Sequence, residues 1–383
     1  MGAVGVYLGA LRRRRVRRYR GAMPKPPAAE VIAGDRAVRV SSPDRVIYPA
    51  TETTPEVTKV MVAQYFADVE DGLMRALRDR PTALERWTKG VLPGLELGTG
   101  RPGEKADAFY QKRVPVGAPD YLESCEITFP SGRTAYEVCP TEIAVPVWCA
   151  HMGTLTFHPW PVRRDDVNHP DELRIDLDPQ PGTNFRDAVR VAGVAKELLD
   201  ELGLVGWPKT SGNRGVHIYV RIEPRWTFEE VRHAAIGFGR ELEKRDSGVT
   251  TAWWKEERGA RIFVDYNQNC RDRTIASAYS LRPKPGAPVS SPMTWAELAE
   301  VTDPAAYNLF TVPVRLAEHG DPWAEIDERH DSIEPLLALY AESGLGEMPF
   351  PPDYPKMPGE PPRVQPSKKV AAHWDEAGNR VER

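Results

Sequence analysis

The chain has 383 residues, of which 41% are hydrophobic, and a formal net charge of -4 at pH 7. This length and composition can fill a substantial core and exclude a collagen-like, coiled-coil or wholly disordered protein. Its sequence has neither an apolar run long enough for a transmembrane helix nor a Cys-x-x-Cys pair, which argues against a membrane span, a disulfide framework and a thiolate zinc site.

Residues 1–22 form a basic segment that contains no acidic residue. Its arginines follow a short apolar stretch, which is the reverse of the order in a signal peptide. We therefore expect a disordered N-terminal extension, and a basic arm that binds nucleic acid is the alternative. The main domain is expected to span residues 23–346.

Strand and helix patterns alternate from residue 173 onward. Residues 173–178 alternate between apolar and polar side chains, which predicts a strand. Helix caps are expected at Thr183, Thr227 and Thr294. The predicted elements are a strand over 173–178, a helix over about 184–202, a strand over 216–222, a helix over about 228–244, a strand over 261–265 and a short helix after 294. This order predicts an α+β fold class with a mixed or antiparallel sheet flanked by helices.

The C-terminal segment, residues 347–383, is rich in proline. Proline cannot occupy a regular helix interior or an inner strand. We therefore predict an extended tail from about residue 347.

Three aspartates are candidates for a metal centre. Asp176 and Asp178 lie two residues apart on the first predicted strand, so both carboxylates project to one side. Asp265 ends a hydrophobic strand and adds a third carboxylate. Three such groups can hold two Mg²⁺ or Mn²⁺ ions that activate a primer hydroxyl and steady a pyrophosphate leaving group. The alternatives are a surface pair with an ordinary strand-end aspartate, or the Asp-x-Asp site of a nucleotide-sugar glycosyltransferase.

The turn over residues 211–215 is a candidate cradle for a triphosphate. Small residues there would let backbone amides approach phosphate oxygens, beside the Ser211 hydroxyl and the Arg214 guanidinium. The turn ends at Gly215, and His217 alternates with its apolar neighbours, so it faces the opposite way. The turn is not a P-loop, because the Gly-Lys-Ser/Thr ending is missing, and a plain hairpin turn is the alternative.

Other candidate residues have weaker signals when each is taken alone. His158 fits a hydrogen-bonded core histidine as well as a ligand-binding one, and Arg282 fits a phosphate clamp or a solvated loop charge. Phe109, Tyr110 and Lys112 combine stacking surface with charge, as single-strand binding requires, but a strand with one buried face would show the same pattern.

Together these segments resemble the polymerase domain of bacterial ligase D and its stand-alone relatives, including Prim-PolC, in the archaeo-eukaryotic primase superfamily. The resemblance runs from about residue 42 to residue 295. The motifs that carry it are His158-Pro159-Trp160, Asp176-Leu177-Asp178-Pro179, Ser211-Gly212-Asn213-Arg214-Gly215-Val216-His217, Val264-Asp265-Tyr266 and Tyr279-Ser280-Leu281-Arg282.

The resemblance implies a primase-polymerase catalytic core without a zinc domain, in which about residues 30–150 contact DNA and about residues 151–300 hold the catalytic centre. It implies templated nucleotidyl transfer, with Asp176, Asp178 and Asp265 as catalytic residues that bind two Mn²⁺ or Mg²⁺ ions. The nucleotide-binding residues would be His158, Ser211, Arg214, Gly215, His217 and Arg282. The DNA-binding residues would be Arg45, Arg86, Lys89, Phe109, Tyr110 and Lys112.

The same resemblance implies the substrates and partners. The substrates are gapped or 5′-phosphorylated DNA and either NTPs or dNTPs, with a preference for ribonucleotides. The partner is a DNA ligase in trans, since no Lys-x-Asp-Gly ligase motif occurs. We expect a monomer in the cytoplasm, associated with the nucleoid.

The chain departs from the family pattern near the expected 5′-phosphate pocket. Family members often carry basic residues where this chain has Pro55 and Glu85, while Arg45, Arg86 and Lys89 remain. This difference favours filling of short gaps in DNA repair over joining of broken ends, and end joining on aligned 3′ overhangs is the alternative. A non-catalytic nucleic-acid-binding module would explain the aromatic pair but would not require three strand-borne carboxylates.

Overall fold

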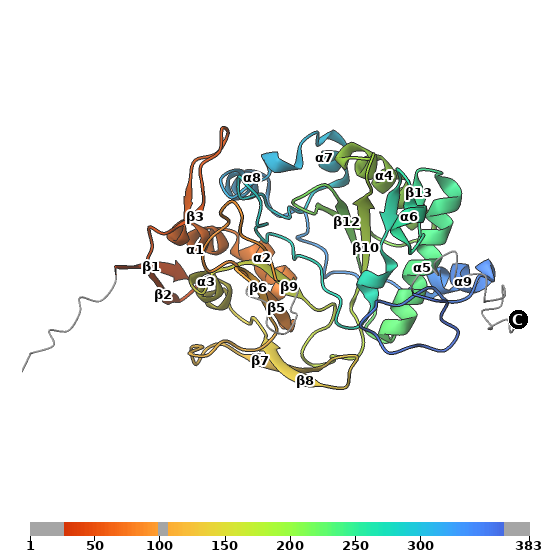
Figure 1. The fold of residues 1–383 in the computed structure, drawn as a ribbon, viewed down its shortest axis with the longest axis horizontal. Coiled ribbons are helices and arrows are strands. Elements are labelled where there is room, and N and C mark those ends of the chain that lie inside the picture. The colour runs from red at the N-terminus through yellow and green to blue at the C-terminus, as the bar shows by residue number, and fades with distance from the viewer. Residues whose placement is uncertain (1–26, 99–105, 364–383) are drawn as a thin grey trace, which may run out of the picture.

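The computed structural model describes residues 27–98 and 106–363. Two five-stranded β-sheets lie in opposite halves of the molecule (Figure 1), and the described residues also form two small two-stranded sheets, β1-β2 and β3-β4. The predicted basic extension, residues 1–22, lies outside the described residues. Among the helices that are described, none is long and apolar enough to cross a membrane.

The first half is built on antiparallel strands with helices packed beside them. Its main sheet has the order β6-β5-β8-β7, and β9 pairs with β5. The elements are β1 (Ala28–Ala33), β2 (Arg36–Ser41), β3 (Val46–Tyr48), β4 (Val57–Thr58), α1 (Lys59–Asp68), α2 (Glu70–Leu77), β5 (Thr82–Arg86), β6 (Phe109–Gln111), β7 (Ser124–Thr128), β8 (Thr134–Val138), α3 (Ala144–His151) and β9 (Thr154–Pro159). Every residue of β9 is buried, which places His158 inside the molecule.

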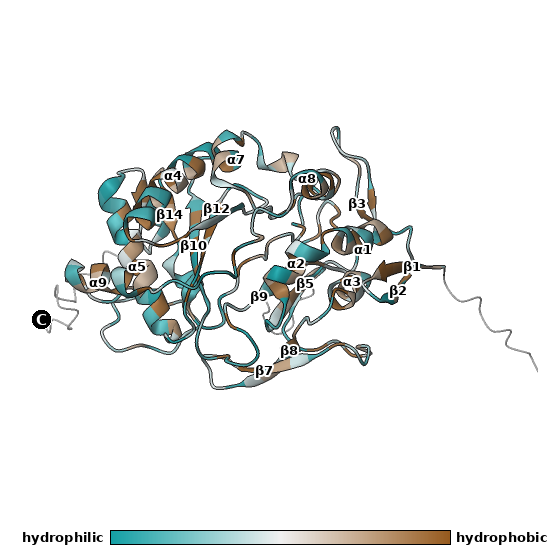
Figure 2. Ribbon diagram, turned by 180° about the vertical axis from the view of Figure 1, so that it is seen from behind, coloured by the Kyte–Doolittle hydropathy of each residue, from teal (hydrophilic) through white to brown (hydrophobic). Residues whose placement is uncertain are grey.

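The second half holds a mixed sheet with the order β11-β12-β10-β14-β13, in which only the β13–β14 pair is parallel. Helices α4 and α5 alternate hydrophobic and hydrophilic residues (Figure 2), and their buried residues pack with the strands in one hydrophobic cluster. The elements are β10 (Glu172–Pro179), α4 (Phe185–Glu201), β11 (Trp207–Thr210), β12 (Val216–Arg221), α5 (Phe228–Arg245), β13 (Val249–Thr250), α6 (Lys255–Arg258), β14 (Ile262–Val264) and the 3₁₀ helix η1 (Tyr266–Asn269).

These elements confirm the predicted α+β fold class. The strands at 173–178, 216–222 and 261–265 and the helices capped by Thr227 and Thr294 all form within a residue or two of the prediction. The N-cap of α4 is Asn184, not Thr183, because the Asn184 side chain accepts the backbone N–H of Arg186.

The segment over residues 276–292 connects the two sheets. The backbone N–H of Ser277 donates to the carbonyl of Phe157 in β9 at 2.9 Å. At the other end of the segment, the Ser291 carbonyl accepts the N–H of Thr210 in β11, also at 2.9 Å. One short stretch of chain therefore fixes β9 and β11 relative to each other.

A buried ion-pair network reinforces this connection at the start of β10. The Arg80 guanidinium contacts Asp171 at 2.5 Å and Glu172 at 3.0 Å, and Arg174 contacts Glu172 at 2.6 Å. Arg174 also donates to the Pro159 carbonyl at the end of β9, at 2.9 Å. Although burial opposes the shift, the charges of Arg80 and Arg174 lower the pKa of Glu172 below its usual value, so the network stays ionised.

The last described elements are α7 (Trp295–Glu300), the 3₁₀ helix η2 (Pro304–Ala306), α8 (Thr311–His319) and α9 (Glu334–Ser343). Helix α9 lies against α5 (Figure 1).

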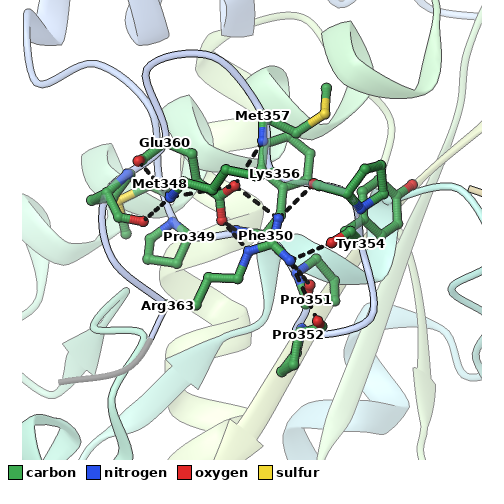
Figure 3. A network of polar contacts seen from close by, with 12 residues as sticks. Met348, Pro349, Phe350, Pro351, Pro352, Tyr354, Lys356, Met357, Glu360 and Arg363 are labelled. Atoms are coloured by element: carbon green, nitrogen blue, oxygen red, sulfur yellow. Dashed lines mark hydrogen bonds and ion pairs between the residues drawn. The ribbon is translucent and has the colours of Figure 1, made fainter.

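Residues 347–363 correct the predicted tail boundary. They form no helix or strand, as the prolines indicate, but they fold back on the domain and on themselves (Figure 3). Phe350 is buried, and Glu360 accepts the backbone N–H groups of Phe350 and Met357 at 2.8 and 3.0 Å and a guanidinium N–H of Arg363 at 2.8 Å. The remainder of the predicted tail lies outside the described residues.

Candidate active site

Two adjacent strands bring the three aspartates together. Asp176 and Asp178 project from β10, and Asp265 follows β14, which pairs with β10 through Leu177 and Val264. The backbone N–H of Asp265 donates to the Asp176 carbonyl at 3.0 Å, which extends this pairing by one residue. The sheet register therefore places all three carboxylates at one location, as the sequence predicts.

The carboxylates are crowded enough to perturb one another. Burial, followed by the charges of Asp265 and Asp178, raises the pKa of Asp176 well above its usual value. Burial also raises the pKa of Asp265. Amide side chains orient two of the groups: Gln180 donates to Asp178 at 3.1 Å, and Gln268 donates to Asp265 at 3.2 Å.

This donor set fits divalent cations. All three side chains offer carboxylate oxygens, which Mg²⁺ and Mn²⁺ prefer, and a bound cation would relieve the repulsion that raises the pKa of Asp176. The closest cluster of ligating side chains in the described part of the chain is a different one, formed by Glu229, His233 and Glu347, whose ligand atoms lie within 4.8 Å of one another.

The Glu229–His233–Glu347 cluster lies on α5 and the C-terminal segment, where it forms ion pairs. Glu347 contacts the His233 ring at 2.7 Å and also binds the buried Arg232 guanidinium. Against the effect of burial, the His233 hydrogen bond and the Arg232 charge lower the pKa of Glu347 to about 2. This cluster therefore holds residues 347–363 against α5.

His217 lies on β12 directly beside the aspartates. Its Nε2 atom is 3.4 Å from Oδ1 of Asp176. Its other ring nitrogen, Nδ1, lies 2.8 Å from Nζ of the fully buried Lys209 on β11. Burial and then the Lys209 charge lower the pKa of His217 well below its usual value, so the ring is neutral. Sequence reasoning missed Lys209, although a hairpin with its turn at 211–215 places residues 209 and 217 opposite each other.

The turn over residues 211–215 differs from the open amide cradle that the sequence predicts. The Ser211 hydroxyl oxygen accepts the backbone N–H groups of Asn213 at 3.2 Å and Gly215 at 3.0 Å, so these amides are used within the turn. Gly215 is required because a Cβ there would lie 2.9 Å from the Leu177 carbonyl of β10. Arg214 is exposed and is free to reach over the turn, with one contact of 3.4 Å to the Pro179 carbonyl.

The opposite wall of the site comes from β5 and β9. Nε2 of His158 lies 3.0 Å from one Glu85 oxygen, and the other Glu85 oxygen accepts the Trp87 indole N–H at 3.0 Å. Burial opposes the shift, but the hydrogen bond from His158 lowers the pKa of Glu85, which stays ionised. Glu85 therefore orients His158. In the sequence, Glu85 stands out only because family members often carry a basic residue at this position.

Arg282 lies between the two walls. Its charge acts on Glu85 and His158 from one wall and on Lys209 and His217 from the other. The buried Nε atom of Arg282 has no hydrogen-bond partner in the described part of the structure. An arginine between two neutral histidines is suited to bind phosphate oxygens.

The predicted aromatic pair lies at the rim of this site. Phe109 and Tyr110 on β6 are 37% and 45% exposed. The Tyr110 ring meets the His158 ring edge-on with centroids 5.1 Å apart, and the Arg86 guanidinium lies 5.3 Å from the centre of the Phe109 ring. The aromatic surface therefore continues directly from His158.

The four basic DNA-binding candidates do not form one pocket. Arg45 donates to the Thr88 carbonyl at 2.9 Å, which places it next to Lys89. Arg86 instead donates to a backbone carbonyl at 3.0 Å beside the aromatic pair. Lys89 and Lys112 each pair with an aspartate, at 2.9 and 2.6 Å. Arg45 and Lys89 thus lie together, whereas Arg86, the third residue expected at the 5′-phosphate pocket, lies beside the aromatic pair.

Comparison with known proteins agrees with this fold. The family described as "LigD, primase-polymerase domain" matches residues 58–323. The chain therefore belongs to the LigD primase-polymerase domain family.

Individual relatives extend this result. The chain is 32% identical over 308 residues to the multifunctional non-homologous end joining protein LigD of Pseudomonas aeruginosa, covering 79% of this chain and 34% of the relative. It is 30% identical to the protein of the same name from Mycolicibacterium smegmatis, covering 76% and 36%. The chain thus spans about a third of the length of these relatives.

A solved structure confirms the fold. The polymerase domain from Mycobacterium tuberculosis ligase D in complex with DNA matches with a TM-score of 0.65 and 28% sequence identity, covering 76% of this chain and 98% of that chain. The match confirms the predicted family and the predicted primase-polymerase core.

Proposed function

We propose that this chain is a DNA-directed primase-polymerase that adds nucleotides, preferably ribonucleotides, to a primer 3′-hydroxyl at short gaps in DNA. The observation that carries the proposal is the placement of Asp176, Asp178 and Asp265 on or directly after the neighbouring inner strands β10 and β14 of the mixed sheet, with Asp176 held at a raised pKa by burial and by the other two. Crowded carboxylates of this kind cost stability, which a structural role does not explain.

The three aspartates are proposed to hold two divalent ions, Mn²⁺ or Mg²⁺. When bound, such ions lower the pKa of a hydroxyl nucleophile and neutralise charge on the transferred phosphoryl group. The chain itself supplies the orientation of the carboxylates: the Gln180 and Gln268 amides fix Asp178 and Asp265 through hydrogen bonds.

The triphosphate of the incoming nucleotide is proposed to lie between the two walls. Arg282 offers an unpartnered guanidinium nitrogen there, and Arg214 can reach over the turn from the outside. His158 and His217 are both held neutral, so each has one ring N–H. The N–H of His158 donates to Glu85, whereas His217 can present its N–H to a phosphate or sugar oxygen. Ser211 closes the turn that positions His217.

The DNA is proposed to pass along the rim formed by Phe109 and Tyr110. Each exposed ring offers a face on which a template base can stack, and stacking of this kind tolerates any base sequence. Arg45 and Lys89 lie together at one turn and are the proposed contacts for a downstream 5′-phosphate. With this substrate, we propose that the protein acts at the nucleoid in the cytoplasm.

The choice of gap filling over end joining rests on the weak 5′-phosphate pocket. Glu85 is hydrogen-bonded to His158 in the active site, Lys89 is paired with an aspartate, and Pro55 supplies no charge. The second candidate function is extension of aligned 3′ overhangs. The relatives favour it, because they are named non-homologous end joining proteins.

In either function, sealing of the product would depend on a DNA ligase outside this sequence, which contains no Lys-x-Asp-Gly motif.

The test is primer extension on two matched substrates, a duplex with a short gap that carries a 5′-phosphate and a pair of ends with complementary 3′ overhangs. Separate NTP and dNTP pools measure sugar preference in the same assay. We expect more extension on the gap and with NTPs. Stronger extension on the overhangs would replace gap filling with end joining, and no template-matched addition on either substrate would refute polymerase function.

A further inference from the structure

Glu85 and His158 lie side by side on one face of the first sheet. The β5–β9 register pairs His158 with Ala83, two residues before Glu85. The β5–β6 register pairs Glu85 with Tyr110. Side chains at paired and diagonal positions project from the same face of a sheet and are near neighbours. The fold therefore commits Glu85 to a contact with the His158 ring, beside Tyr110.

Both oxygens of the buried Glu85 carboxylate are hydrogen-bond acceptors. One accepts the Trp87 indole N–H at 3.0 Å, and an indole can only donate. The other lies 3.0 Å from Nε2 of His158. Burial opposes the shift, but the hydrogen bonds from His158 and Trp87 lower the pKa of Glu85, so the carboxylate has no proton of its own to donate.

This contact decides which nitrogen of the His158 ring carries the proton. The contact with an ionised carboxylate is a hydrogen bond only if Nε2 donates. Burial lowers the pKa of His158, so the ring is neutral and has a single proton. Nδ1 therefore presents a lone pair. It has no hydrogen-bond partner among the described residues and is not one of their fully buried unpartnered atoms, so it is open to a ligand.

An unprotonated Nδ1 selects the chemical group that can bind to it. Ionised phosphate oxygens are acceptors and cannot satisfy a lone pair, whereas a hydroxyl can donate to it. The sugar is the part of a nucleotide that carries hydroxyl groups, and these groups are the same for all four bases. Phosphate oxygens are instead suited to Arg282, whose buried Nε atom has no partner in the described part of the chain.

We propose that Glu85 is a positioning residue that fixes the His158 proton on Nε2, so that Nδ1 accepts a hydrogen bond from a sugar hydroxyl of the incoming nucleotide. The sugar contact rests on the polymerase function proposed above, whereas the position of the proton does not. Family members often carry a basic residue at position 85, and a basic side chain offers only donors, so the acceptor for the Nε2 proton depends on the glutamate.

The first experiment is ¹⁵N NMR of the full chain labelled in its histidine side chains, without DNA or nucleotide. Protonated and unprotonated nitrogens of a neutral imidazole resonate in separate ranges, and the signals that disappear in His158→Phe assign the His158 ring. We expect a protonated Nε2 and an unprotonated Nδ1 in the wild type. A protonated Nδ1 overturns the proposal, whatever the activity of the protein.

The Glu85→Gln variant tests the cause. Because the Trp87 indole can only donate, the amide oxygen should remain on Trp87 and the amide N–H should face Nε2 of His158, which moves the ring proton to Nδ1. Glu137→Gln is the matched control. Glu137 also accepts an indole N–H, from Trp160 at 3.0 Å, but has no hydrogen bond to a histidine in the described part of the chain. It should leave the His158 signals unchanged, and a proton that stays on Nε2 in Glu85→Gln would refute the role of Glu85.

Nucleotide analogues test the sugar contact. Single-nucleotide addition is compared for an NTP and for analogues in which fluorine, which cannot donate, replaces the 2′- or the 3′-hydroxyl. We expect replacement at one of these positions to raise KM about three- to tenfold in the wild type. His158→Phe keeps a ring but removes Nδ1, so this ratio should disappear in the variant.

The outcomes separate this proposal from the polymerase function. Equal KM values for the NTP and both analogues in the wild type, or a ratio that persists in His158→Phe, would refute the sugar contact alone. No nucleotide addition by the wild type would refute the polymerase function. If either variant does not fold, the wild-type spectrum and the wild-type analogue series still decide the proposal.

Discussion

Glu85 allows a sharp test of the electrostatics of the site. Its two oxygens accept different buried donors, the Trp87 indole and the His158 ring, both at 3.0 Å. In Glu85→Gln only one oxygen remains, so one buried donor faces an amide N–H instead of an acceptor. Loss of a hydrogen bond to a charged group should lower the free energy of unfolding by about 1.5–3 kcal/mol at pH 7.

The pH dependence of this loss has a definite sign. Because the folded state lowers the pKa of Glu85, its contribution to stability is present above the usual carboxyl pKa near 4.5 and is lost as the pH falls through the folded value. The difference between the wild type and Glu85→Gln should therefore shrink below about pH 4.5.

Glu137 is the matched control, because it is also a buried glutamate that accepts an indole N–H, from Trp160 at 3.0 Å. Its second oxygen has no partner in the described part of the chain, and burial raises its pKa to about 8. A glutamine resembles the protonated form of the glutamate. At pH 7, Glu137→Gln should therefore leave the free energy of unfolding unchanged or raise it by up to ~3 kcal/mol. Because the folded state raises the pKa of Glu137, the wild type loses stability as the pH rises. The stability gain of Glu137→Gln over the wild type should therefore grow between about pH 5 and pH 8.

Urea unfolding followed by tryptophan fluorescence measures both variants. The reasoning is refuted if the two substitutions cost the same, or if Glu137→Gln is the more destabilising one at pH 7.

Three further outcomes are expected. Asp176→Asn should abolish nucleotide addition yet raise the melting temperature of the metal-free protein, because it removes a crowded carboxylate; a lower melting temperature would contradict this. Mn²⁺ affinity, measured by calorimetry, should rise with pH, since the raised pKa of Asp176 makes protons compete with the metal; a pH-independent affinity would contradict it. Glu347→Gln should reduce stability in urea by about 1–3 kcal/mol at pH 7, and the difference should vanish as the pH falls from about 4.5 towards 2; a constant difference would show that the Glu347 charge is not involved.

The parts of the fold that could be predicted from sequence are those with a local signal. The strand over residues 173–178 shows its alternation directly, and the α5 helix begins at a capping box of Thr227 and Glu230. Asp176 and Asp178 could be predicted because each occupies a strand position, where the sheet fixes its direction, and Asp265 because it directly follows a hydrophobic strand.

Other features depend on contacts between distant segments. Lys209 is a single lysine in a four-residue strand, and its importance follows from burial against residues 276 and 290. Glu85 interacts with His158, which is 73 residues away.

The fold of residues 347–363 was mispredicted for the same reason. Their prolines exclude helix and inner strand but do not exclude packing. This segment is held by its contacts with Arg232 and His233 on α5 and by the internal Glu360–Arg363 pair. No periodicity in the segment itself could indicate those partners.

The central claim is that the three aspartates support templated nucleotidyl transfer. The most direct measurement is extension of a labelled primer across a short gap with Mn²⁺ or Mg²⁺, varying the template base, for the wild type and for a variant with both Asp176→Ala and Asp178→Ala. We predict that the wild type adds the nucleotide that matches each template base and that the variant adds none. Equal addition by the variant, or addition that ignores the template, would contradict the account.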